Sequence, residues 1–378
     1  MQVAGASADK TQRKLHSRLA KYPDHFTCLD EQLHASRRRI VNNLYSMTNI
    51  VRAESAIDMC TDLFMSRMRE YADSGEVINI SSWVQMYLPN GPHNWVASQL
   101  FFSRMFGFLK EGGDHQGYIR SLDTLLPALA VTSVMPTYVR TLFLMAGTMF
   151  GSVRRALTSL NEIERAAELC IAERQEILEN GETVERKDIM SSLFGIIQEK
   201  GNKADFGLTE AKVEVYVALF AGSDTTAAAV SSILYHLVKN PQAYRKLTEE
   251  IRQAAASGEL SGPSVQYSEA MKLPYLTACC KEGMRMHPSV GLTLPRNVPK
   301  GGSMICGEWF PEGTRVGVNA AVVHRDKTIF GDDANEFRPE RWFQDNRENM
   351  ERHMFQFGSG SRTCIGKNEQ VVTQFIPA

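Results

Sequence analysis

A single cysteine between glycines is the feature that most limits how this chain can fold. Residues 357–366 read F-G-S-G-S-R-T-C-I-G, with Cys364 two residues after Arg362 and two before Gly366. Glycines allow a sharp turn that points backbone N–H groups inward, and such donors favour a thiolate over a thiol. Arg362 and the N-terminus of a following helix would favour the same charge. The loop therefore predicts a thiolate ligand, and the alternative is a Gly/Ser surface loop with a buried structural cysteine.

The remaining cysteines and the charge balance narrow the function classes. The 378 residues contain seven cysteines and no C-x-x-C pair, which argues against a zinc ribbon or a disulfide framework and favours a reducing, intracellular setting. The net charge of -1 provides no field for holding nucleic acid. An open thiolate is instead what a haem iron requires for strong electron donation.

A long helix is predicted over residues 209–239. Thr209 can cap its start, and Pro241 ends it because a residue before proline avoids the α conformation. The segment 221–226 in its middle reads A-G-S-D-T-T.

This segment predicts a distortion of the helix. Gly222 weakens the helix, and the hydroxyl of Thr225 can bond to the carbonyl of Ala221. Such distortions open grooves in which a ligand or a water fits. The alternative is a packing face of small residues.

The other periodic segments predict a mainly α fold with a small β-sheet portion and an irregular C-terminal third. No linker is recognisable, so we treat residues 1–378 as one domain. The expected elements are helices at 37–72, 151–180, 187–200, 241–256 and 274–287, and short strands at 303–306 and 315–323.

An apolar stretch at 125–150 contains Pro127, Pro136 and Arg140. These residues argue against a membrane span, which requires about 20 uninterrupted apolar residues. We expect two helices with a bend. They are either buried core helices or a peripheral contact with a membrane surface.

Four motifs, in this order along the chain, resemble the signatures of the cytochrome P450 family. A-G-S-D-T-T resembles its oxygen-activating segment, E-G-M-R at 282–285 its E-x-x-R pair, F-R-P-E-R-W at 337–342 its P-E-R-F segment, and the cysteine loop its haem-binding signature. The resemblance covers about 33–368. Residues 292–326 are similar to the fungal branch that includes pisatin demethylase.

The resemblance implies a P450 fold and a role for each matching residue. It implies that Cys364 ligates the iron of haem b within the loop bounded by Phe357 and Gly366. Arg296, Arg362 and the helical pair His34 and Arg38 would contact the haem propionates. Asp224 would relay protons, and Thr225 would position dioxygen and its water. Glu282, Arg285 and Arg341 would form a buried structural network.

The implied activity is that of a monooxygenase that inserts one atom of O2 into a small apolar organic substrate, by hydroxylation or oxidative O-demethylation, in fungal secondary metabolism. Because the chain has no flavin or nicotinamide fingerprint, NADPH would supply electrons through a separate cytochrome P450 reductase. Two alternatives stay open: a haem-thiolate isomerase or dehydratase, and a truncated, non-catalytic homologue.

Three segments depart from the family pattern. Relatives are longer at both ends, so we expect the P450 fold to be incomplete at its N- and C-termini. Full-length relatives sit at the endoplasmic reticulum membrane, whereas no N-terminal anchor is recognisable here. Residues 88–100 and 369–378 do not match, so altered splicing or an imperfect gene model is our hypothesis for both. The tail therefore does not predict the helix that would support Cys364.

Overall fold

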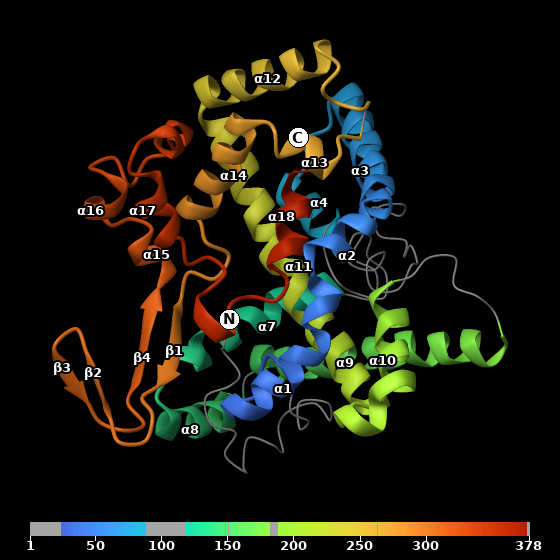
Figure 1. Cartoon of the computed structure of the whole chain (residues 1–378), viewed down its shortest axis with the longest axis vertical. Helices are drawn as coiled ribbons and strands as arrows, with labels where there is room; N and C mark the ends of the chain where they lie inside the picture. Colours follow the sequence, from blue (N-terminus) through green and yellow to red (C-terminus); the bar gives the residue numbers. More distant parts are fainter. Residues whose placement is uncertain are drawn as a thin grey trace.

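Helices dominate the computed structural model, which describes residues 24–87, 118–147, 149, 151–181, 188–262 and 264–375 (Figure 1). The described strands form two small antiparallel ladders. This arrangement confirms the predicted mainly α fold. The unmatched segment 88–100 and the last three residues lie outside the described residues.

All the regular elements in the first half of the described chain are helices. Its elements are α1 (Glu31–Val41), the 3₁₀ turn η3 (Asn42–Tyr45), α2 (Met47–Arg52), α3 (Glu54–Ser74), α4 (Ile80–Tyr87), α7 (Tyr118–Val134), α8 (Thr137–Gly147), α9 (Gly151–Glu179) and α10 (Ile189–Ala204).

The second half contains the longest described helix, α11, and all the described strands. Its elements are α11 (Leu208–Lys239), α12 (Pro241–Ala256), α13 (Tyr267–Ala270), α14 (Pro274–Met286), β1 (Thr293–Asn297), β2 (Ser303–Ile305), β3 (Glu308–Phe310), β4 (Arg315–Asn319), α15 (Ala320–Val323), α16 (Lys327–Phe330), η5 (Pro339–Phe343), α17 (Arg347–Arg352), η6 (Gly360–Arg362) and α18 (Lys367–Phe375).

Helix α11 runs through the middle of the molecule and packs against α4, α9, α14 and α18 (Figure 1). Its 32 residues correspond to ~48 Å. It begins one residue earlier than predicted. Gly207 is its N-cap, and the Gly207 N–H donates to the side chain of Glu210 at 2.9 Å. The predicted Thr209 cap is therefore wrong, because the Glu210 carboxylate satisfies this helix end.

A close crossing fixes α14 against α11. A Cβ atom on Gly283 would lie 2.6 Å from the Ile233 side chain, so only glycine fits this contact. The hydroxyl of Ser232 donates to the carbonyl of Gly283 at 2.9 Å. The crossing places the E-G-M-R segment of α14 against the central helix.

The single helix predicted over 37–72 is wrong, because η3 and α2 interrupt it. Ser46 adopts an extended conformation there, and the side-chain amide of Asn49 donates to the carbonyl of Asn43 at 2.7 Å. Asparagine and serine side chains compete with the helical backbone for hydrogen bonds.

The strands are shorter than predicted. β1 pairs with β4, and β2 pairs with β3. The strand expected over 315–323 ends at Asn319, whose side chain accepts the N–H of Val322 and caps α15. This pairing places Arg296 on β1 opposite Val316 on β4.

The apolar stretch 125–150 forms α7 and α8, with the predicted bend near Pro136. Pro127 lies inside α7 and does not end it. Large apolar side chains of the α8 region are exposed, among them Tyr138, Leu142 and Met149. Within the described residues, one helix, α11, is long and apolar enough to cross a membrane, and 50% of its most apolar 18-residue window is buried inside the structure.

Candidate functional site

A cavity of about 1130 Å³, including its open mouth, lies between α1, α11, β1 and the cysteine loop. The cavity brings together most of the predicted site residues, namely His34, Arg38, Thr225, Arg296, Phe357, Arg362, Cys364 and Gly366. Asp224 is not among the residues that line it.

The cysteine loop folds back on itself. The Cys364 N–H donates to the carbonyl of Phe357 at 2.8 Å, and Gly358 turns the chain with a φ of +68°. The Cys364 side chain is accessible from the cavity. Its surroundings raise the pKa of the thiol through desolvation, which the Gly366 N–H and the charge of Arg38 oppose.

The helix that the tail did not predict is present. α18 begins at Lys367, three residues after Cys364, and extends to Phe375. Its apolar residues Val371 and Val372 pack into the core. The helix is therefore stabilised by burial of these side chains, although the segment lacks a family motif. Glu369 in its first turn lines the cavity, and burial raises the pKa of that carboxyl to about 7.

Arg362 was expected to favour the thiolate, but its guanidinium is engaged elsewhere. It donates to a carboxylate oxygen of Glu31 at 2.7 Å and to the carbonyl of Cys28 at 2.7 Å. The Glu31 charge therefore balances Arg362. A cation that lowers the Cys364 pKa is Arg38.

His34 and Arg38 present polar side chains to the cavity. Both ring nitrogens of His34 are buried without a hydrogen-bond partner, and the residue is 2% exposed. Burial lowers the His34 pKa, and the charges of Arg362 and Arg38 add to that effect. Among the described residues, Arg38 has no ion-pair partner. Buried polar atoms of this kind indicate a polar ligand.

Thr225 and Ser289 make hydrogen bonds in the middle of α11, which stays an uninterrupted α-helix from Leu208 to Lys239, so the predicted distortion is wrong. The Thr225 hydroxyl donates to the carbonyl of Ala221 at 2.9 Å, as predicted. The Ser289 hydroxyl donates to the carbonyl of Thr225 at 2.5 Å. The loop after α14 is therefore hydrogen-bonded to the backbone carbonyl of Thr225 at the cavity wall.

Asp224 points away from the cavity toward α4. Its Oδ1 atom accepts the side-chain amide of Gln85 at 3.4 Å, and the same amide donates to Asp123 at 3.0 Å. The Oδ2 atom of Asp224 is buried without a partner. Burial raises the Asp224 pKa to about 6, the Gln85 hydrogen bond opposes the rise, and the Asp123 charge adds to it.

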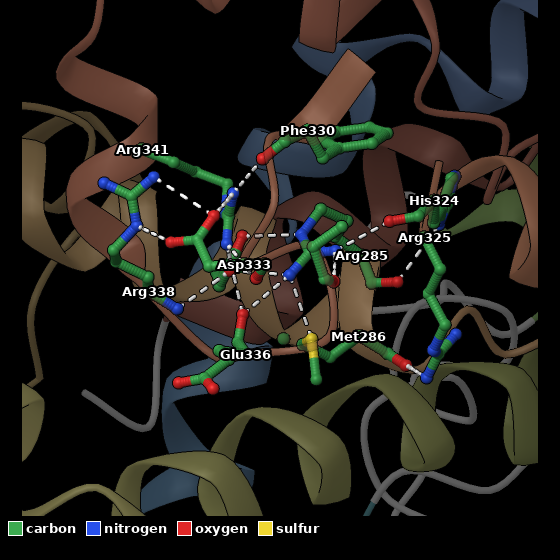
Figure 2. A network of polar contacts seen from close by, with 12 residues as sticks. Arg285, Met286, His324, Arg325, Phe330, Asp333, Glu336, Arg338 and Arg341 are labelled. Atoms are coloured by element: carbon green, nitrogen blue, oxygen red, sulfur yellow. Dashed lines mark hydrogen bonds and ion pairs between the residues drawn. The ribbon is translucent and has the colours of Figure 1, made fainter. Parts of the chain in front are cut away.

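Glu282, Arg285 and Arg341 form a network with no solvent exposure. Glu282 Oε1 accepts from Arg285 Nη2 and from Arg341 Nε, each at 2.8 Å. Figure 2 shows the two guanidiniums extending to backbone carbonyls of the segment 324–336. Trp342 Nε1–H donates to the other Glu282 oxygen at 3.0 Å. Every charge in the network is therefore paired or hydrogen-bonded.

A comparison with known sequences decides the family. A profile of the family described as Cytochrome P450 matches residues 7–368. This chain belongs to the cytochrome P450 family. The match ends at the predicted residue and begins before the predicted start near 33.

Similar P450s come from fungi. The chain is 40% identical over 350 residues to the cytochrome P450 monooxygenase gsfF of Penicillium aethiopicum, covering 92% of this chain and 68% of the relative. It is 34% identical over 333 residues to the cytochrome P450 monooxygenase ACRTS1 of Alternaria alternata, with 88% and 86% covered. It is 31% identical over 358 residues to pisatin demethylase of Fusarium vanettenii, with 94% and 66% covered. The predicted branch and the enzyme class, cytochrome P450 monooxygenase, are confirmed.

The residues of this P450 fit a haem-thiolate group. The accessible Cys364 thiol could ligate the iron. His34, without a hydrogen-bond partner, and Arg38, without an ion-pair partner among the described residues, could bind carboxylates. Arg296 lies near Arg362, whose charge, after burial, lowers the Arg296 pKa. The cavity therefore offers a thiol on one side and cationic side chains along one edge.

Sequence reasoning missed His25 and Glu214. The His25 ring binds the Glu214 carboxylate across 189 residues of sequence, and His25 lines the P450 cavity. A histidine before the first helix and a lone glutamate on an apolar helix gave no motif. The glutamate on an otherwise buried face of α11 was the one available signal.

Proposed function

We propose that this P450 inserts one oxygen atom from O2 into an apolar organic substrate, by hydroxylation or oxidative O-demethylation, in fungal secondary metabolism. The observation that supports it most is the accessible Cys364 thiol in the same cavity as Thr225 and the cation edge. When bound, haem supplies the oxygen-activation chemistry of the family.

The chain's own residues would hold the group and manage protons. Cys364 would ligate the iron between Phe357 and Gly366, and His34, Arg38, Arg296 and Arg362 would bind the carboxylates. The Thr225 hydroxyl would orient a water where α11 lines the cavity. Asp224, with a pKa of about 6, would take up and release protons near neutral pH.

The buried network would have a structural role. Glu282, Arg285 and Arg341 have no solvent exposure, so no substrate reaches them. Their guanidiniums bind the carbonyls of the segment that leads toward the cysteine loop. We assign them to holding that loop.

NADPH would supply electrons through a separate cytochrome P450 reductase. The exposed apolar side chains of α8 suit a peripheral contact with a membrane surface such as that of the endoplasmic reticulum. Binding of the purified chain to vesicles, lost when Leu142 and Met145 are replaced by serine, would support this contact. If the protein with both serines binds vesicles as well as the unmodified chain does, the proposed membrane contact through α8 is wrong.

A reduced carbon-monoxide difference spectrum of the expressed chain tests the haem-thiolate assignment. We expect a red-shifted Soret band that Cys364→Ser abolishes. Cys306→Ser is the matched control, because Cys306 is also exposed but lies on the turn between β2 and β3. Absence of the band in the unmodified chain would favour the non-catalytic alternative.

Turnover assays separate the oxygenase from the isomerase or dehydratase alternative. The proposal requires NADPH, the reductase and O2 for product formation. Turnover that continues when NADPH, the reductase and O2 are all left out would favour the isomerase or dehydratase alternative.

A further inference from the structure

His25 and Glu214 form a buried acid–base pair in the wall of the cavity. The His25 Nδ1 atom lies 3.1 Å from one Glu214 carboxylate oxygen and 2.8 Å from the other. The two residues are 5% and 4% exposed. Glu214 comes from α11, and His25 comes from the segment before α1.

The charge of the pair is balanced. Burial alone would lower the His25 pKa, but the adjacent Glu214 carboxylate outweighs it by charge and hydrogen bond, so the His25 pKa is raised. A buried imidazolium beside a carboxylate is neutral as a pair.

One nitrogen of the pair remains for a ligand. Nδ1 is committed to Glu214, while no hydrogen bond joins Nε2 to another of the residues that the structure describes. His25 lines the cavity beside Phe26, Val217 and Ala218. A ligand that displaces water from this Nε2–H must bring an acceptor, because a donor left without one is costly.

We propose that His25, oriented by Glu214, is a specificity-determining residue that donates its Nε2–H to a carbonyl oxygen of an otherwise apolar substrate. The inference rests on the proposed function and adds the substrate class to it. A neutral carbonyl satisfies the donor without adding charge. A carboxylate would add a second negative charge beside Glu214, and Arg38, whose charge also acts on His25, is assigned to the haem carboxylates. The apolar neighbours would contact the rest of the substrate.

Three rigid probes that share one tricyclic ring system test the proposal: 9-fluorenone, fluorene and fluorene-9-carboxylate. Equilibrium dialysis against the purified full chain measures each affinity without depending on a haem signal. The carbon-monoxide spectrum recorded on the same sample reports separately on the proposed function. We expect 9-fluorenone to bind at least about tenfold more tightly than fluorene, and the carboxylate to bind more weakly than 9-fluorenone.

Variants assign the preference to the pair. His25→Phe keeps a flat ring and should make 9-fluorenone and fluorene bind equally. Glu214→Gln should reduce the preference, because the imidazole loses the charge that holds its proton. Phe26→Leu is the control. It alters the apolar wall and should change both affinities in parallel.

Several results would overturn the proposal. Equal binding of 9-fluorenone and fluorene by the unmodified chain is one, and a preference that persists in His25→Phe is another. Tightest binding of the carboxylate would also overturn it. A preference for 9-fluorenone over fluorene that is seen only in haem-free protein would also overturn it, because it would mean that His25 binds a haem carboxylate when haem is present. If His25→Phe fails to fold, as judged by circular dichroism, Glu214→Gln decides.

Discussion

The Nε2 atom of His324 accepts the backbone N–H of Phe355 at 2.8 Å, and its Nδ1 atom lies 3.2 Å from the carbonyl of Arg285. His324 is fully buried. One side chain therefore connects the buried network on α14 to the chain two residues before Phe357, where the cysteine loop begins. This connection gives the network a path to the loop that is independent of Arg341.

Replacing Glu282 by glutamine should destabilise the protein by about 3–5 kcal/mol. The change leaves two fully buried guanidiniums, Arg285 and Arg341, without their shared carboxylate. Urea unfolding followed by circular dichroism measures the loss. Glu351→Gln is the control, because Glu351 pairs with Lys281 at the surface and such pairs contribute less than about 1 kcal/mol. Equal losses in both variants would contradict the structural role of the network.

His324 should make the protein less stable in acid. Burial lowers its pKa from 6.5 to about 4, so the native state prefers the neutral ring. The unfolded state then binds the extra proton between these values, and its contribution to stability is present above pH 6.5 and lost as pH falls to about 4. The loss is on the order of 3 kcal/mol.

His324→Gln tests that contribution, because glutamine is neutral at every pH. Unfolding free energies of both proteins are measured from pH 7 to pH 4. The difference between them should change over this interval, with the unmodified chain losing more stability in acid. A difference that stays constant with pH would show that His324 titrates normally.

Sequence reasoning succeeded where a single segment carries the information. The spacing of Glu282 and Arg285 puts both on one helix face, and Thr225 bonds to the carbonyl four residues earlier. It failed where distant segments meet. The pairing of Arg362 with Glu31 spans 331 residues, and no local pattern encodes it. α18 was missed because its tail lacks a family motif, although burial of its valines suffices to form a helix.

Thr225→Val should separate the hydroxyl from the shape of the side chain. The hydrogen bond to Ala221 is lost, which should change stability by only about 1 kcal/mol. If the hydroxyl positions a water for proton delivery, product formation should fall on the order of a hundredfold. Product and hydrogen peroxide are measured together with NADPH consumption. Thr225→Ser, which keeps the hydroxyl, should retain most of the activity, and similar losses in both variants would argue against a role for the hydroxyl.

The contacts of Asp224 predict the sign of its effect on stability. Burial raises its pKa from 3.8 to about 6, so the native state prefers the protonated carboxyl. This contribution is present below pH 3.8 and is lost as pH rises through 6, by about 3 kcal/mol. Asp224→Asn, neutral at every pH, should remove it, and the difference between the two unfolding free energies measures the Asp224 pKa.

Two neighbouring variants should move that pKa in opposite directions. Gln85→Leu removes the amide that donates to Asp224, so the pKa should rise further. Asp123→Asn removes a like charge, so the pKa should fall. For each variant, the Asp224 pKa is obtained from the difference in unfolding free energy between the protein with Asp224 and the protein with Asp224→Asn. Shifts in the same direction would contradict the bridging position of Gln85, because loss of a donor and loss of a negative charge act on the carboxylate with opposite sign.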